Sequence, residues 1–87
     1  MNYEVRLRQA AQQRLDALPE RDYERVTATI YTLEENPRPP RVKKLADSGL
    51  WRVRIGQYRI VYAIGDRAQL VTIVRVARRR EDTYRRL

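Results

Sequence analysis

The chain has 87 residues, 43% of them hydrophobic, so it is long enough for one small domain with a single core, and we expect residues 1–87 to form that domain. It contains no cysteine and no histidine, which excludes a disulfide framework, a thiolate metal site and the commonest catalytic base. The net charge of +8 is carried mostly by arginine, which pairs bidentately with phosphate and therefore indicates nucleic acid, the ribosome or an acidic protein as the partner.

No segment reaches the roughly 18 apolar residues that a membrane-spanning helix needs, and the first ten residues, MNYEVRLRQA, include no apolar stretch. We therefore expect a cytoplasmic protein that does not contact a membrane. We also expect no metal and no cofactor. Any chemistry must then use arginine, lysine, tyrosine or carboxylates.

The N-terminal part of the chain predicts one strand and two helices. Tyr3, Val5 and Leu7 alternate with charged residues, as in a half-buried strand. Apolar residues then recur at helical spacing in two groups: Ala10, Ala11, Leu15 and Leu18, and Tyr23, Val26, Ile30 and Leu33. Pro19 should end the first helix and lie in the first turn of the second. The two helices should form a hairpin with one apolar face.

The C-terminal part predicts strands. The stretch NPRPPR, residues 36–41, ends the second helix because prolines remove backbone donors. VKKLADSG then predicts a short extended segment and a turn at Ser48-Gly49. Three longer strands follow, separated by the turn pairs Gly56-Gln57 and Gly65-Asp66: Leu50–Ile55, Tyr58–Ile64 and Leu70–Val76. We expect an α+β fold of order β-α-α-β-β-β-β, with the helical hairpin packed on one face of a mainly antiparallel sheet.

The stretch LWRVRIGQYRIVYAI predicts a β-hairpin with an unusual charge pattern. If Gly56 and Gln57 form a two-residue turn, one apolar face is made by Trp51, Val53, Ile55, Tyr58, Ile60 and Tyr62. Arg54 then lies directly opposite Arg59 on the other face, and Arg52 lies opposite Val61. Like charges in such positions destabilise a strand pair by up to about 1 kcal/mol. The pattern therefore favours a phosphate-binding surface over a basic face that only contacts water.

More cations follow on and after the last strand. Arg75 lies within it, and the run ARRRED could bring Arg78, Arg79 or Arg80 toward the hairpin arginines. Tyr84 lies near these cations in the sequence, and nearby positive charge would lower the pKa of its phenol from about 10. Tyr84 could equally be a terminal aromatic side chain that packs on the domain.

The element order, the block KKLADSGLWRVRIGQYRIVYAI and the ending VARRREDTY resemble the RelE branch of the RelE/ParE toxin superfamily over nearly the whole chain. The resemblance implies a toxin of a type II toxin–antitoxin system, a ribosome-dependent endoribonuclease that cleaves messenger RNA in the A site. It further implies a metal-independent reaction, in which the 2′-hydroxyl of the mRNA attacks the adjacent phosphate and leaves a 2′,3′-cyclic phosphate.

Carried over residue by residue, the resemblance implies that the catalytic residues are Arg52, Arg54, Arg59, Arg79 and Tyr84. We expect further RNA contacts from Lys43, Lys44, Arg75, Arg78 and Arg80. Relatives often have lysine at the positions of Arg52 and Arg54. Because arginine stays protonated up to a pH of about 12, these two suit phosphate binding better than proton abstraction. Proton transfer then falls to Tyr84, or to Glu81 or Asp82.

Two other functions remain open from the sequence. One is a ParE-like inhibitor of DNA gyrase with the same fold and no RNA cleavage. The other is a nucleic-acid-binding module without catalysis, whose binding would weaken steeply with salt. In the toxin interpretation the partners are the ribosome, mRNA and a cognate acidic antitoxin similar to RelB. An acidic segment that wraps the basic surface would block access of phosphate.

Overall fold

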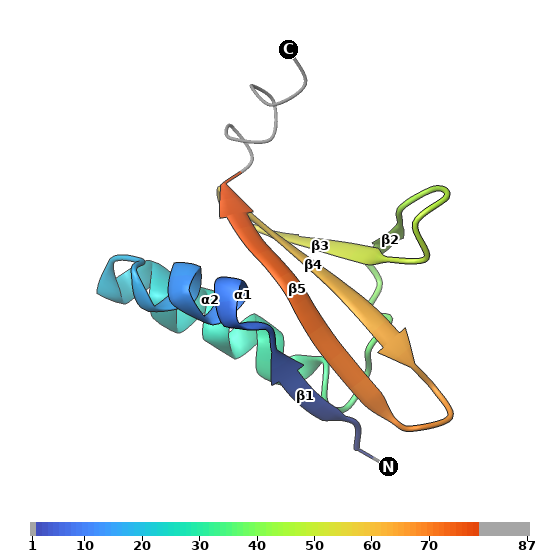
Figure 1. Cartoon of the computed structure of the whole chain (residues 1–87). Coiled ribbons are helices and arrows are strands. Elements are labelled where there is room, and N and C mark those ends of the chain that lie inside the picture. The colour runs from blue at the N-terminus through green and yellow to red at the C-terminus, as the bar shows by residue number, and fades with distance from the viewer. Residues whose placement is uncertain (1, 79–87) are drawn as a thin grey trace.

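The computed structural model of the chain describes residues 2–78 and contains five strands and two helices (Figure 1). They are β1 (Glu4–Leu7), α1 (Gln9–Asp16), α2 (Glu20–Thr32), β2 (Lys43–Lys44), β3 (Trp51–Ile55), β4 (Tyr58–Gly65) and β5 (Leu70–Arg78). The predicted order of elements and the α+β class are confirmed.

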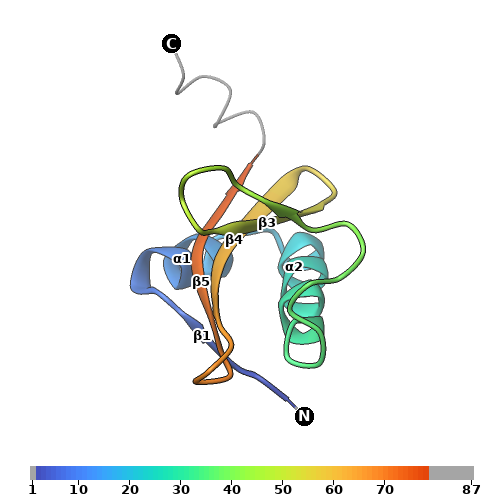
Figure 2. The same cartoon turned by 90° about the vertical axis from the view of Figure 1, so that its right-hand side faces the viewer.

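The strands form one mixed sheet in the order β1-β5-β4-β3-β2. β1 runs parallel to β5, and the other three neighbouring pairs are antiparallel, as predicted for a mainly antiparallel sheet. The sheet is strongly twisted, so that β3 lies across the view of Figure 2 while β5 runs vertically. This order places β4 at the centre, between β3 and β5.

The helical hairpin begins and ends close to where the sequence predicts. Pro19 lies one position before α2, not within its first turn, and its carbonyl accepts a hydrogen bond from the N–H of Tyr23 at 2.8 Å. Glu20 and Asp22 lie in the first turn, where carboxylates interact favourably with the helix dipole. The hairpin therefore follows from a proline and two acidic residues placed at the helix boundary.

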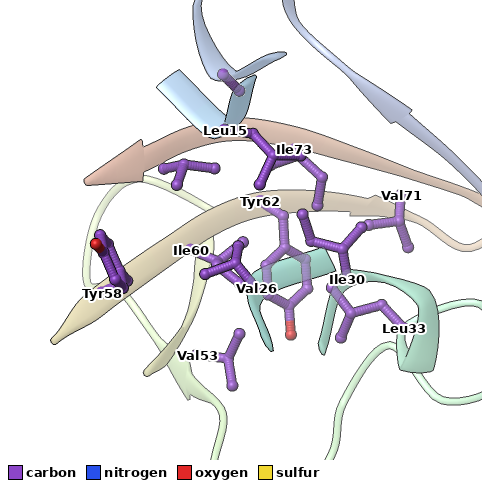
Figure 3. Close-up of a cluster of buried hydrophobic side chains, with 12 residues drawn as sticks. Leu15, Val26, Ile30, Leu33, Val53, Tyr58, Ile60, Tyr62, Val71 and Ile73 are labelled. Atoms are coloured by element: carbon purple, nitrogen blue, oxygen red, sulfur yellow. The ribbon is translucent and has the colours of Figure 1, made fainter. Parts of the chain in front are cut away.

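The core lies between the two helices and one face of the sheet (Figure 3). Leu15 from α1 and Val26 and Ile30 from α2 pack against side chains of β4 and β5. In Figure 3 the ring of Tyr62 reaches from β4 toward α2, beside Val26 and Ile30. We call this side of the sheet the inner face and the opposite side the outer face.

The proline-rich segment after α2 makes hydrogen bonds and an ion pair with residues of β4 and of the β4–β5 turn. The hydroxyl of the fully buried Tyr62 donates a hydrogen bond to the carbonyl of Pro37 at 2.7 Å. Burial raises the pKa of Tyr62 to about 12. Arg38 makes a two-bond ion pair with Asp66 in the β4–β5 turn, at 2.8 and 3.2 Å, and Tyr3 donates to the same carboxylate at 2.7 Å. These contacts fix the segment that leads into β2.

Neither helix within residues 2–78 is long and apolar enough to cross a membrane.

The buried bond from Tyr62 to Pro37 gives a stability prediction. Tyr62→Phe leaves the Pro37 carbonyl without its partner, so the free energy of unfolding should fall by about 1–3 kcal/mol. Tyr31→Phe is the matched control, because Tyr31 is 61% exposed. Urea denaturation of both variants checks this, and equal stabilities of the two would contradict the prediction.

Candidate nucleic-acid interface

The hairpin of β3 and β4 has the register that the sequence predicts. Gly56 and Gln57 form the turn, with Gly56 at a φ of +59°, a backbone conformation that favours glycine. Ile55 pairs with Tyr58, Val53 with Ile60 and Trp51 with Tyr62. Of these six inner-face side chains four are buried, whereas Trp51 and Ile55 are half-buried. The predicted apolar face is confirmed.

Arg54 lies directly opposite Arg59 on the outer face, also as predicted. Arg54 is exposed and Arg59 is half-buried. Within residues 2–78 the Arg54 side chain makes no hydrogen bond or ion pair. We call Arg54 and Arg59 the arginine pair. Two like charges therefore face each other across two hydrogen-bonded strands, next to the turn that joins them.

Arg52 is only 9% exposed. It does lie on the outer face, opposite Val61, but Val61 is also buried there. The reason is position within the sheet: β2 pairs with β3 at Trp51 and Arg52 and no further, so Arg52 has a strand on both sides while Arg54 has one. Arg52 therefore lies on the predicted face of the sheet but offers little surface to a ligand.

The two lysines of β2 lie on opposite faces. Lys43 pairs with Arg52 and belongs to the outer face, whereas Lys44 pairs with Trp51. The Lys44 ammonium lies 5.7 Å from the centre of the Trp51 ring, and the Arg38 guanidinium lies 5.0 Å from it. Only Lys43 shares a face with the arginine pair.

A β-bulge in β5 determines on which face of the sheet its arginines lie. Val61 pairs with Arg75 but Tyr62 pairs with Ile73, so Val74 is an extra residue in β5. The extra residue reverses the alternation beyond it. Arg75 therefore lies on the outer face, exposed, while Arg78 lies on the inner face opposite Tyr58.

Arg78 consequently does not join the arginine pair on the outer face. Its guanidinium lies 5.9 Å from the centre of the Tyr58 ring. The Tyr58 hydroxyl donates a 2.7 Å hydrogen bond to the carboxylate of Asp22 on α2, which raises the pKa of the phenol. No local sequence pattern indicates this link between Asp22 and Tyr58, because 36 residues separate the two.

Three predicted site residues, Arg79, Arg80 and Tyr84, lie outside the described residues. The same holds for Glu81 and Asp82, the other candidates for proton transfer.

The charge of β2 to β5 is of one sign. The sequences of β2 to β5 contain seven lysines and arginines and no carboxylate: Lys43, Lys44, Arg52, Arg54, Arg59, Arg75 and Arg78. In residues 2–78 no group of three or more carboxylates gathers in a way that could hold a metal ion. Such strands can bind an anion and stabilise charge that develops on it, because arginine donates several N–H bonds and never loses its charge. Arginine cannot abstract a proton.

Comparison with known proteins identifies similar sequences and structures. Residues 5–83 match the family model described as "ParE toxin of type II toxin-antitoxin system, parDE". No curated protein sequence matches the chain.

Among solved structures, the toxin of the RelBE2 toxin–antitoxin complex from Mycobacterium tuberculosis is 32% identical, with a TM-score of 0.81 over 91% of this chain and 100% of that chain. The archaeal RelE–RelB complex from Pyrococcus horikoshii gives 29% identity and a TM-score of 0.81 over 91% of this chain and 97% of that chain. The isolated RelE toxin of Escherichia coli, at 19% identity and a TM-score of 0.77 over 98% of this chain and 99% of that chain, shares the fold.

The arginine pair should cost the folded chain stability. We expect Arg54→Gln to raise the free energy of unfolding by about 0.2–1 kcal/mol, because it removes the like charge opposite Arg59. The gain should shrink in about 1 M salt, where the Debye length falls to roughly 3 Å. Urea denaturation at low and high salt measures both effects, and a loss of stability at low salt would refute the repulsion.

Proposed function

Because this chain belongs to the ParE toxin family, in the RelE/ParE superfamily of type II toxin–antitoxin toxins, we propose that it is a ribosome-dependent endoribonuclease that cleaves messenger RNA in the A site. The superfamily that the sequence indicated is thereby confirmed. The RNA-cleaving activity is our proposal. We also propose that the protein acts in the cytoplasm, where ribosomes translate mRNA.

The arginine pair is the observation that carries the proposal. A strand pair with Arg54 directly opposite Arg59 is destabilised unless an anion lies between them. The pair belongs to four strands, β2 to β5, whose charged residues are all cations. The phosphate of an RNA strand would offset the repulsion between Arg54 and Arg59, and each guanidinium can donate two parallel N–H bonds to phosphate oxygens.

The proposed reaction needs three things from the chain: a held phosphate, stabilisation of its developing charge and a route for protons. The 2′-oxygen forms a bond to phosphorus as the bond from phosphorus to the 5′-oxygen breaks. The 2′-hydroxyl proton leaves to a base, and the 5′-oxygen of the next nucleotide receives a proton. The products are a 2′,3′-cyclic phosphate and a 5′-hydroxyl, with no metal or cofactor required.

We assign the phosphate to Arg54 and Arg59, and to Arg79 by its resemblance to the basic motif of RelE toxins. In the transition state the nonbridging oxygens gain negative charge, which these guanidinium groups stabilise. Arg52 is only 9% exposed, so we assign it a supporting positive charge on the same face of the sheet and no direct contact with the RNA. Proton transfer and stacking on a base are assigned to Tyr84, again by resemblance.

Similar toxins have been crystallised with antitoxins: RelE with RelB from P. horikoshii, and the RelBE2 pair from M. tuberculosis. We propose that a RelB-like acidic protein binds and neutralises this chain. The net charge of +8 supports an acidic partner, because complementary charge accelerates association and selects the partner.

The match to the ParE family model favours a second candidate, inhibition of DNA gyrase. In that function the basic strands would contact the enzyme or its DNA without cleaving RNA. A supercoiling assay with purified gyrase, run beside a cleavage assay on programmed ribosomes, separates the two functions.

Purified chain added to ribosomes programmed with a defined mRNA should produce cuts at the A-site codon with a 2′,3′-cyclic phosphate end. Arg59→Gln should lower the cleavage rate by about 10²–10³, because one donor to the transition state is lost. Arg67→Gln, in the exposed turn at the opposite end of β4, is the control and should cleave normally. Absence of cleavage by the unaltered chain, together with inhibited supercoiling, would replace this proposal by the second candidate.

Tyr84→Phe removes the hydroxyl and keeps the ring. If Tyr84 transfers a proton, the cleavage rate on ribosomes should fall by about 10²–10⁴ while affinity for the programmed ribosome stays similar. Single-turnover rates and binding measured on the same preparation check both quantities. Cleavage at the unaltered rate would remove Tyr84 from proton transfer and leave Glu81 and Asp82.

A further inference from the structure

The turn between β3 and β4 carries a contact that the sequence did not reveal. A Cβ atom placed on Gly56 would lie 3.0, 3.2 and 3.3 Å from Nη2, Nη1 and Cζ of Arg25 on α2. The end of the guanidinium group that carries the two Nη atoms therefore lies close to the glycine. Gly56 therefore serves two purposes: it adopts the positive φ of the turn, and it leaves room for the Arg25 guanidinium.

The donors of Arg25 remain available in this position. A guanidinium group carries five N–H donors, so its contact with one glycine leaves several of them free to meet a ligand. Arg25 is exposed, and within residues 2–78 its side chain makes no hydrogen bond or ion pair. The carboxylate of Asp22, on the same face of α2, does not pair with Arg25. It accepts a hydrogen bond from the hydroxyl of Tyr58 at 2.7 Å.

The contact places Arg25 at the same end of the sheet as the arginine pair. Gly56 is two residues beyond Arg54 in the chain, which is about 7 Å along a strand. In Figure 1 the end of β5 lies beside the β3–β4 turn, and Arg78 pairs there with Tyr58. Cations from both faces of the sheet and from α2 therefore surround one end of the hairpin.

We propose that Arg25 is a second phosphate-binding position, for a nucleotide that neighbours the one held by the arginine pair. The RNA strand would leave the outer face at Arg54, round the turn at Gly56 and contact Arg25. This inference rests on the proposed function, because it assumes that RNA binds the arginine pair. It adds a residue on α2 to a site that the sequence assigned wholly to the strands and the C-terminal segment.

The test measures binding of a non-cleavable single-stranded RNA, with 2′-O-methyl groups throughout, by fluorescence anisotropy at several salt concentrations. Each phosphate contact on single-stranded nucleic acid contributes about −0.7 to the slope of log K against log salt. Arg25→Gln should make the slope shallower by about 0.7 and weaken binding several-fold. Arg25→Lys keeps the charge and should retain the slope.

Arg67→Gln removes the same charge at the other end of the sheet and should leave both the slope and the affinity unchanged. A dinucleotide with a single phosphate should bind the unaltered chain and the Arg25→Gln variant equally, because it cannot reach the second position. Thermal unfolding of each variant identifies any change that comes from a damaged turn.

The outcomes separate this inference from the proposed function. If Arg54→Gln weakens RNA binding and Arg25→Gln behaves like Arg67→Gln, the role of Arg25 is overturned and the arginine pair stands. If Arg25→Lys weakens binding as much as Arg25→Gln, Arg25 acts through packing and the inference is also overturned. If the unaltered chain binds no RNA in this assay, the role of Arg25 is overturned, whereas the proposed function is decided separately by the cleavage assay on programmed ribosomes.

Discussion

The two-residue turn at Gly56 and Gln57 is the constraint on which the rest of the site depends. A turn this short allows one register, and that register sends every second residue of β3 and β4 into the core. The same choice brings Arg54 opposite Arg59. A slip of one residue would bury the arginines and expose Ile60 and Tyr62, so the apolar core enforces the unfavourable charge pair. Core packing thus holds the two cations in place at a cost in stability.

The second constraint is the bulge at Val74. Uninterrupted alternation along β5 would turn Arg75 toward the helices and Arg78 away from them. The extra residue reverses both, so Val76 can fill the core and Arg75 reaches the outer face. Bulges of this kind redirect side chains near functional sites. Here one inserted residue determines which cations can meet a ligand on which side of the sheet.

The candidate site combines rigid and exposed parts. Arg59 lies on the central strand, and the core side chains Ile60 and Tyr62 on the same strand are fully buried, so its backbone is held firmly. Arg54 and Arg25 lie next to the turn and are exposed, where a polymer can approach. The proposed chemistry needs this combination, because preorganised donors stabilise a transition state without first having to move.

The sequence alone determined the order of the elements, the helical hairpin, the hairpin register and the opposition of Arg54 and Arg59. Each of these depends on local rules: apolar periodicity, prolines at helix boundaries and a glycine in a short turn. Tertiary structure decided the burial of Arg52, which depends on how far β2 extends along β3, and the separation of Lys43 from Lys44. It also decided the position of Arg78, through a bulge that alternation of residues does not show, and the contact of Arg25 with Gly56. These features join residues that are distant in the chain, and only the packed fold determines which of them meet.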